Sequence, residues 1–451
     1  MAEAAPPCNT SSSTPQSVEQ LLQACIHCGM CLTSCPTYVA TGNEAESPRG
    51  RLYLMQKWNE GVLSEADDLA PYLDNCLGCL NCQTVCPSGV QYGSLLNTHR
   101  ATLLEQRLPS PWRWVQQLAF KWILPNPALL TLMTWGLRLY QQTGLRWLLA
   151  KLGVLALLAK VAPKLAHAET LAPTVPAPCP TLKAGQSFGD PTDPTVALHL
   201  GCLMNAMFAP VHWATIKVLV ANRYHVVLAH QTCCGALAHH AGEVAIATSL
   251  AETNLALWQR HDPTPVALLF NSAGCGAELH EYGHLLPPEH PNHAQALALG
   301  QASVDVAAWL MKDGALPVPP PLAVPLSVTY HAACHLHHAQ RVQTQPVDLL
   351  KSIPGLTLTP LTEAETCCGS AGIYNLQHPE LSEPILERKM THVVATQANI
   401  VATGNPGCQM QLQHGLRQVG SSQQVMHPIE LLAMAYPSQL GVWQPKAIPS
   451  A

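Results

Sequence analysis

Charged side chains are scarce in this chain of 451 residues: they make up 11% of it, against 48% hydrophobic residues. Such a composition excludes a chain that is mostly disordered and solvated, and it supplies enough apolar residues for packed cores. Basic residues are not in excess either, since the formal net charge is −5. This balance argues against nucleic acid as a general partner. At this length we expect two to four domains.

Motifs for substrate chemistry are missing as well. No Gly-x-Gly-x-x-Gly follows a predicted strand, so the sequence has no dinucleotide-binding fingerprint, and no flavin domain can be recognised in it. The 22 His residues form no His-Glu-x-x-His zinc signature. We therefore predict no catalytic residue in this chain.

A secretory signal is also absent from the N-terminal residues 1–16, which have neither a basic start nor an apolar core. Rich in Pro, Ser and Thr, they are predicted to form a disordered tail. We expect a cytoplasmic location, where thiols stay reduced. Cys8 in this tail and Cys179 in a later Pro-rich stretch are expected to be incidental.

Cysteine, in contrast, is abundant, with 18 residues. Two copies of Cys-x-x-Cys-x-x-Cys-x-x-x-Cys-Pro lie 51 residues apart: Cys25, Cys28, Cys31, Cys35 with Pro36, and Cys76, Cys79, Cys82, Cys86 with Pro87. This is the ligand run of bacterial ferredoxins, in which the fourth Cys ligates the other cluster. Zinc and disulfides are the alternatives, but zinc closes with four ligands and has no use for the fourth Cys-Pro.

The doubled run predicts two 4Fe–4S clusters with crossed ligands. Cluster 1 is expected to use Cys25, Cys28, Cys31 and Cys86, and cluster 2 to use Cys76, Cys79, Cys82 and Cys35. Between the two runs, Pro48 is expected to open a helix through Trp58. Two interpretations stay open for Arg49 and Arg51 near its start: a solvated helix end, or charge compensation for anionic clusters.

A second cysteine pattern occurs twice in the later part of the chain, with offsets of 132 to 134 positions. Its cysteines are Cys202, Cys233, Cys234 and Cys275 in one half, and Cys334, Cys367, Cys368 and Cys408 in the other. Two matching sets of four are hard to explain as ordinary buried cysteines. They are candidate ligands for a further iron–sulfur cluster.

Short apolar runs precede several of these cysteines and predict buried strands: 195–200, 266–270, 326–331 and 400–403. Helices are predicted over 243–260 and 380–398, so the alternation favours a βαβ-type sheet in each half. Sites in such sheets lie at the carboxyl ends of the strands. We expect the halves to pair around a central cleft lined by up to eight thiolates. His335, His337 and His338 either line this cleft as polar loop residues or tune protons and clusters.

Residues 106–168 hold eight basic residues, no acidic residue and five of the ten Trp. The longest uncharged run has 16 residues and contains two Pro, which is too short and too broken for a spanning helix. Three interpretations remain: a helical face on a membrane surface with anionic lipids, a docking face for a partner subunit, or an ordinary helical layer.

The predicted fold class is multidomain α+β and α/β. The expected parts are the tail 1–16, a helical two-cluster ferredoxin-like domain 17–107, a basic Trp-rich helical segment 108–170, a Pro-rich linker 171–194, and cysteine-rich repeats 195–316 and 322–440.

The motifs resemble those of a known family. Cys-Cys-Gly at 233–235 and 367–369 looks like the duplicated cysteine-rich (CCG) domain of heterodisulfide reductase and of several dehydrogenase subunits. With Ala24–Gly29, Pro48–Arg51 and Cys334–Gln340, the chain is similar to the iron–sulfur subunits of glycolate oxidase (glycolate dehydrogenase). It departs from heterodisulfide reductase at the last Cys-x-x-Cys pair of each repeat, where Glu278 and Gln411 replace the second Cys. This departure argues against the larger cluster that splits disulfides.

The resemblance implies an electron-transfer subunit that works beside FAD-binding dehydrogenase subunits in a hetero-oligomer. Electrons from glycolate, or another 2-hydroxy acid, would pass toward a membrane quinone or another acceptor. The implied location is cytoplasmic, with peripheral contact to the inner face of the membrane left open. Alternatives are a subunit for lactate or anaerobic glycerol-3-phosphate oxidation, and a disulfide or quinone reductase with a catalytic CCG cleft.

Overall fold

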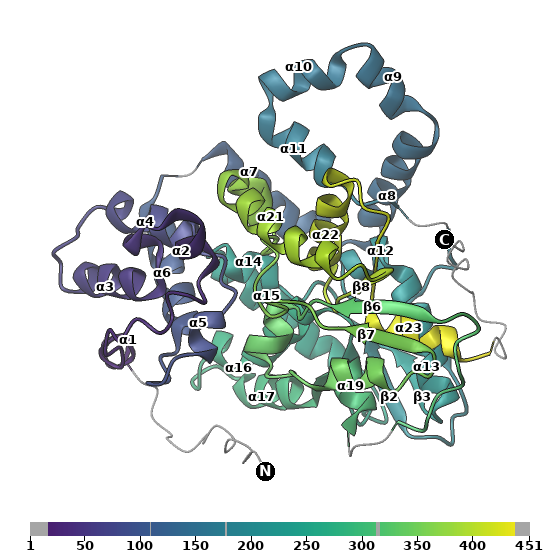
Figure 1. Ribbon diagram of the computed structural model, residues 1–451. Helices are drawn as coiled ribbons and strands as arrows, with labels where there is room; N and C mark the ends of the chain where they lie inside the picture. The colour runs from purple at the N-terminus through teal and green to yellow at the C-terminus, as the bar shows by residue number, and fades with distance from the viewer. Residues whose placement is uncertain (1–16, 109, 176–177, 313–315, 438–451) are drawn as a thin grey trace.

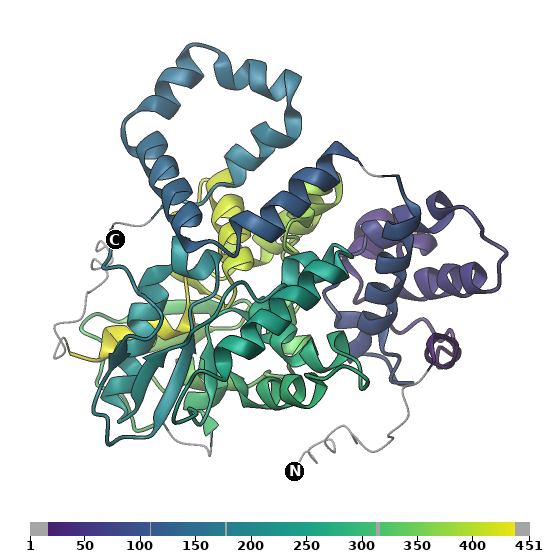
Figure 2. The same ribbon diagram turned by 180° about the vertical axis from the view of Figure 1, so that it is seen from behind.

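A computed structural model describes residues 17–108, 110–175, 178–312 and 316–437. The predicted disordered tail 1–16, with Cys8, lies outside the described residues. The N-terminal part is helical, two α/β units form the body, and a helical arch projects between them (Figures 1 and 2).

The N-terminal unit consists of short helices around the two cysteine runs. They are α1 (Val18–Gln23), α2 (Pro36–Thr41), α3 (Pro48–Asn59), α4 (Ala66–Asp74), α5 (Asn81–Thr84) and α6 (Tyr92–Gln106), with a 3-10 turn at Glu44–Glu46. Ser17 caps α1 in a capping box, and Ser47 caps α3 by accepting a hydrogen bond from the Gly50 N–H. Leu69, Leu73 and Leu95 are fully buried and join the helices into one small core.

The basic segment forms helices that extend away from the body. They are α7 (Pro111–Leu118), a π-helical turn (Ala119–Ile123), α8 (Pro127–Gln142), α9 (Leu145–Lys151), α10 (Val154–Val161) and α11 (Pro163–Leu171). Helices α8 to α11 trace an open arch (Figure 1). No helix among the described residues combines the length and the apolar character needed to cross a bilayer.

The first α/β unit holds a five-stranded sheet with strand order β1-β3-β2-β4-β5. Its strands are β1 (Ser187–Phe188), β2 (Thr195–His199), β3 (His225–Leu228), β4 (Leu268–Phe270) and β5 (Ser303–Asp305). All pairs are parallel except β1–β3. The helices of the unit are α12 (Leu203–Met207), α13 (Ala209–Ala221), α14 (Ala236–His240), α15 (Val244–Trp258), α16 (Ala273–Leu285), α17 (His293–Ala302) and α18 (Val306–Leu310).

The second unit repeats this arrangement in a four-stranded parallel sheet, β7-β6-β8-β9. Its strands are β6 (Leu326–Tyr330), β7 (Leu356–Thr359), β8 (Ile400–Ala402) and β9 (Gln424–Met426). Its helices are α19 (Gln345–Lys351), α20 (Tyr374–Gln377), α21 (Pro379–Ala395), α22 (Pro406–Gln418) and α23 (Pro428–Ala435), with a π-helical turn at His335–Ala339. The order β3-β2-β4-β5 matches β7-β6-β8-β9, so the cysteine repeat is also a repeat of topology.

The two units share one core and one polar seam. Helix α13 of the first packs on α23 of the second, and their buried residues belong to a single apolar cluster. At the seam, His427 Nε2 lies 3.1 Å from the backbone oxygen of Asn271, and the Ala273 N–H donates to the Gly404 oxygen at 3.1 Å. The loops after β4 and β8 therefore meet face to face.

Candidate metal centres

The first thiol set surrounds a small cavity in the N-terminal unit. Cys25, Cys28, Cys31 and Cys86 all line it. His27 and Gly29 have positive φ angles, which let the loop wind tightly between the first three cysteines. Burial raises the pKa of the Cys31 thiol. Cys82 lines the cavity as well, so the four thiols that a 4Fe–4S cluster requires are available there, and the lining fits that group.

The second set lies directly beside the first. Cys35, Cys76 and Cys79 are buried, and Cys82 also lines the first cavity. Cys79 lies within electrostatic range of Cys35 and Cys76, and Cys82 within range of all three. Burial raises the pKa of the Cys79 and Cys82 thiols well above their usual value. Cys35 also lies within electrostatic range of Cys31, and Cys82 within range of Cys31, so the two sets are neighbours and the crossed assignment of Cys35 and Cys86 stays a prediction.

Two arginines face the second set. Arg51 is fully buried, donates to Glu46 at 2.5 Å and to the Tyr72 oxygen at 2.7 Å, and lies 3.9 Å from Cys35 Sγ. The solvated alternative is therefore wrong for Arg51. Arg49 differs, because it is partly exposed and pairs with Glu44.

Arg100 of α6 is the second cation, and sequence reasoning missed it. Its guanidinium donates to the backbone oxygens of Leu73 and Cys76 and, in the first α/β unit, to that of His240. Burial alone would raise the pKa of Cys76, but Arg51 and Arg100 outweigh it, and the pKa is lowered. No local motif marks Arg100, which reaches Cys76 only because α4 packs on α6.

A third thiol set lies at the carboxyl ends of strands in the first α/β unit. Hydrogen bonds connect Cys202 with Cys233, Cys233 with Cys234, and Cys234 with Cys275. Bonds to Cys234 and to His199 lower the pKa of Cys275 to about 5, although burial opposes this.

The fourth set repeats this arrangement in the second unit. Hydrogen bonds join Cys334 with Cys367, Cys367 with Cys368, and Cys368 with Cys408. The ligand atoms of His331, Cys368 and Cys408 lie within 4.8 Å of one another. His331 is fully buried, and neither of its ring nitrogens has a hydrogen-bond partner. An unpartnered imidazole beside two of these thiols is a further candidate ligand.

The thiol–thiol bonds of the two repeats stay within each repeat. Asn405 lies where the two sets approach each other: it accepts from the Gly274 N–H at 3.2 Å, next to Cys275, and its Nδ2 donates to Cys408 Sγ at 3.6 Å. A single cleft lined by up to eight thiols stays a prediction. The replaced fifth positions are buried and bonded. Glu278 contacts His239 at 3.0 Å, and Gln411 bonds Asn375 at 2.7 Å.

The second and fourth sets are in contact. Cys79 and Cys367 belong to one buried cluster with Tyr374, and Cys334 packs against it. The Tyr374 hydroxyl donates to the Asn75 oxygen at 2.9 Å, and His335 Nε2 lies 3.2 Å from the Gly78 oxygen.

The neighbouring His338 joins the same interface. Its Nδ1 lies 3.0 Å from Thr84 Oγ1, and its Nε2 lies 3.1 Å from the Glu365 oxygen. His335 and His338 thus hold the second repeat against the loops of the second cysteine run. His335 also lines a large cleft, and a role of these histidines in tuning protons or clusters stays a prediction.

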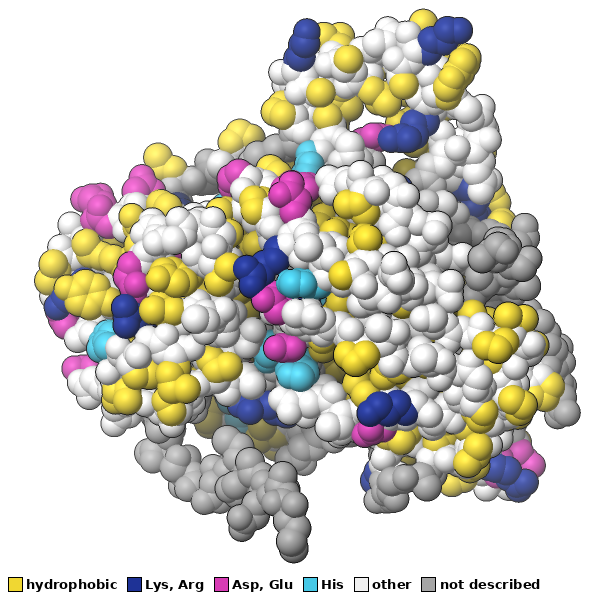
Figure 3. All heavy atoms as spheres, in the orientation of Figure 1, with side chains coloured by type: hydrophobic (Ala, Val, Ile, Leu, Met, Phe, Trp, Pro, Cys, Tyr) yellow, Lys and Arg dark blue, Asp and Glu magenta, His cyan; other side chains and the backbone are white. Residues whose placement is uncertain are grey.

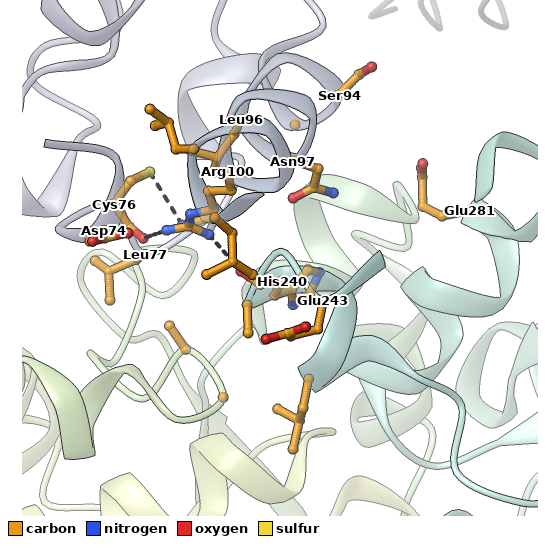
Figure 4. Close-up of a pocket in the computed structure, with 18 of the residues that line it drawn as sticks. Asp74, Cys76, Leu77, Ser94, Leu96, Asn97, Arg100, His240, Glu243 and Glu281 are labelled. Atoms are coloured by element: carbon orange, nitrogen blue, oxygen red, sulfur yellow. Dashed lines mark hydrogen bonds between the residues drawn. The ribbon is translucent and has the colours of Figure 1, made fainter. Parts of the chain in front are cut away.

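A cleft of about 1680 Å³ lies between the N-terminal unit and both α/β units, with Glu278 of the first and His335 of the second among its lining residues. Figure 4 shows Arg100 in it between Cys76 and His240, with Glu243 nearby. Arg113 Nε of α7 donates to Glu243 at 2.7 Å, so the start of the basic segment is fixed at this cleft. Burial lowers the pKa of His240 well below its usual value.

Three sequence families match the parts of the chain in order. The 4Fe-4S dicluster domain matches residues 21–90, the linker region of the glycolate oxidase iron-sulfur subunit matches 111–172, and the cysteine-rich domain matches 196–280 and 328–413. The chain therefore contains a 4Fe–4S dicluster domain followed by a duplicated CCG domain.

Similar proteins match over nearly the whole length. A probable glycolate oxidase iron-sulfur subunit of Bacillus subtilis is 37% identical, covering 91% of this chain and 93% of that protein. The glycolate oxidase iron-sulfur subunit of Escherichia coli is 31% identical, covering 92% and 95%. Lactate utilization protein A of Exiguobacterium is 27% identical over 53% of this chain and 97% of that protein. By identity and coverage together, this chain belongs to the family of glycolate oxidase iron–sulfur subunits.

Proposed function

We propose that this chain is the iron–sulfur electron-transfer subunit of a flavin-dependent glycolate dehydrogenase. The observation that carries the proposal is the buried cluster shared by Cys79 and Cys367, which joins the dicluster domain to the second CCG repeat. The names of the two relatives that match over most of their length support glycolate as the substrate of the complex.

We propose the crossed ligand sets for the dicluster domain: Cys25, Cys28, Cys31 and Cys86 for one cluster, and Cys35, Cys76, Cys79 and Cys82 for the other. Bound 4Fe–4S clusters supply one-electron chemistry. The chain's own part is to hold the thiolates, to exclude water, and to place Arg51 and Arg100 near Cys76. Two cations at a buried site favour the addition of negative charge.

The CCG repeats are proposed to hold a further iron–sulfur cluster. Each offers four thiols, and in the second repeat His331 lies beside Cys368 and Cys408 without another partner. A cluster held by Cys334, Cys367, Cys368 and Cys408 would lie next to the Cys79 side of the dicluster domain. The second repeat is thus placed to exchange electrons with that domain.

Oxidation of the substrate is proposed to take place on FAD-binding partner subunits, in a cytoplasmic hetero-oligomer that passes electrons to a quinone or another acceptor. Lactate is the second candidate substrate, because lactate utilization protein A aligns over 97% of its own length. Glu278 and Gln411 are fully engaged in hydrogen bonds, which argues against a disulfide-splitting CCG cleft with a fifth ligand in each repeat.

The test is anaerobic co-purification with the native partner subunits, followed by iron counting, flavin analysis and a screen of glycolate against lactate. About eight irons per chain indicate two clusters, and about twelve or sixteen indicate occupied CCG repeats. Cys367→Ser should lower the iron content of the twelve- or sixteen-iron form, whereas Cys179→Ser, at a cysteine outside the four sets, should not. Turnover of glycolate by this chain without a flavoprotein would overturn the proposal.

A further inference from the structure

The arch formed by α8 to α11, residues 127–171, exposes an unusual amount of apolar surface and is called the arm below. Near its apex, Trp147, Leu152, Leu157 and Val161 are 61% to 75% exposed. Neither α9 nor α10 contains a buried residue. Figure 3 shows hydrophobic side chains and basic side chains together over this projection. Exposed apolar patches of this kind mark interaction surfaces.

The charge of the arm is of one sign over most of its length. No acidic residue occurs between 106 and 168, although the whole chain carries a net charge of −5. Lys151 and Lys160 are exposed at the apex, and Lys151 lies 4.9 Å from the ring centre of Trp147. The Lys151 ammonium can attract anionic lipid headgroups, and the exposed Trp147 ring is of the amphipathic kind that lies at the membrane interface.

The arm is fixed at its base. Near its end, His167 Nε2 lies 3.0 Å from the Asn375 oxygen, and Arg417 donates to the Thr170 oxygen at 3.1 Å. Gln141 of α8 donates to the Pro173 oxygen at 2.8 Å. Helices α9 and α10, in contrast, pack mainly on each other and on their neighbours in the arm. The apex is therefore presented away from the body on a fixed support.

We infer that the apex of the arm, from Leu145 to Val161, is a docking surface for an anionic lipid bilayer. Helix α10 carries Val, Leu and Ala on nearly all sides with one Lys, which suits insertion at the boundary of headgroups and acyl chains. Lys151 and Lys160 can keep their ammonium groups among the headgroups while their stems lie along apolar surface. Because no described helix can span a bilayer, the contact would be peripheral.

The inference goes beyond the proposed electron transfer and does not require turnover. The test uses the full-length protein, purified anaerobically, in cosedimentation with vesicles of equal parts phosphatidylglycerol and phosphatidylcholine. Vesicles of phosphatidylcholine alone serve as the uncharged reference. A second readout is quenching of Trp fluorescence by brominated phosphatidylglycerol, since Trp135 and Trp147 are exposed on the arm.

We expect binding to the anionic vesicles that weakens with added salt, because salt screens the Lys–headgroup attraction. Lys151→Gln and Lys160→Gln should each weaken binding about fivefold. Leu157→Glu should weaken it more than tenfold. The matched control is Val266→Glu, since Val266 is also 61% exposed but lies before β4, far from the arm in sequence. This control should bind vesicles as the unaltered protein does.

Two results would overturn the inference. One is failure of the unaltered protein to bind anionic vesicles. The other is equal binding by the Leu157→Glu and Val266→Glu variants. A different outcome is that the unaltered chain does not bind vesicles and that Leu157→Glu abolishes co-purification with the partner subunits. The apex would then be a surface that binds protein. Unchanged iron content and circular dichroism of each variant establish that it is folded.

Discussion

The guanidinium of Arg51 lies 3.9 Å from the Sγ atom of Cys35 and is shielded from solvent by the helices of the N-terminal unit. Its charge is balanced by Glu46, which also accepts a hydrogen bond from Asn75 at 2.7 Å. The Arg51–Glu46 ion pair is thus buried beside the thiols proposed for the second cluster. A charge at such a buried position has its largest effect on the reduction potential of a cluster.

Arg51→Gln should lower the reduction potential of that cluster, because a nearby cation stabilises the added electron. It should also destabilise the unit by about 3 to 5 kcal/mol, since the Glu46 carboxylate loses its buried partner. Arg51→Lys retains the charge and should shift the potential less. The measurement is an EPR-monitored redox titration with thermal unfolding. Arg49→Gln, at a partly exposed site, is the control, and an equal shift there would refute a specific role of Arg51.

Cys35→Ser should damage the cluster proposed for Cys76, Cys79 and Cys82 and spare the other. Cys86→Ser should have the reverse effect, because Cys86 lines the cavity of the first set. EPR spectra of the reduced variants and their iron content give the answer. If each variant instead lost the cluster built on its own cysteine run, the crossed arrangement would be excluded.

The contribution of Asp305 to stability should fall as the pH rises from about 4 to 7, because burial raises its pKa from 3.8 to about 7. In this window the folded state binds more protons at Asp305 than the unfolded state does, and above it the contribution levels off. Glu430, also with a pKa of about 7 from burial, contributes in the same direction. Burial lowers the pKa of His212 to about 4 and that of His427 to about 3, so these groups act in the opposite direction, and a variant is needed to isolate the Asp305 contribution.

Asp305→Asn keeps the oxygen that caps Ala307 and removes the ionisation. It should stabilise the chain near pH 8 by up to roughly 4 kcal/mol, for a pKa difference of about 3 units. Urea unfolding at about pH 5 and pH 8 measures this. Asp190→Asn is the control: Asp190 is exposed, and hydrogen bonds from Thr192 lower its pKa, so no such gain is expected. A gain that is the same at both pH values would contradict the explanation.

Gly276→Ala should destabilise the first α/β unit by about 1 to 3 kcal/mol through overpacking. A Cβ at this position would lie 2.1 Å from the Phe270 ring at the end of β4, next to Cys275. Gly136→Ala is the matched control, because a Cβ there meets nothing within 4 Å in the exposed interior of α8. That change should stabilise by up to about 1 kcal/mol. Similar effects of the two substitutions would show that packing on Phe270 is not the cause.

Much of the secondary structure was predictable because its signals are local. Strands were predicted over 195–200, 266–270, 326–331 and 400–403, and β2, β4, β6 and β8 occur there, since central parallel strands buried on both faces appear as apolar runs. No strand was predicted at β1, β3, β5, β7 or β9. These strands have mixed burial, whereas the equally short β4 and β8 are buried throughout and so appear as apolar runs.

The thiol sets, too, were only partly predictable from the sequence. Motif spacing by itself determined that two groups of four ferredoxin-type cysteines and two repeats of four further cysteines exist, because ligand spacing is written along the chain. It did not determine that Arg51 is buried or that Arg100 reaches Cys76. Those outcomes depend on how α3, α4 and α6 pack.

Residue types at fixed short intervals are enough to predict the electron-transfer chemistry and the family. Which repeat meets the dicluster domain, and whether the basic Trp-rich segment covers the core or projects from it, depends on tertiary packing. Cys79 and Cys367 come together through contacts between distant parts of the chain. The exposure of Trp147 and Leu157 likewise depends on what packs over them, which no local pattern encodes.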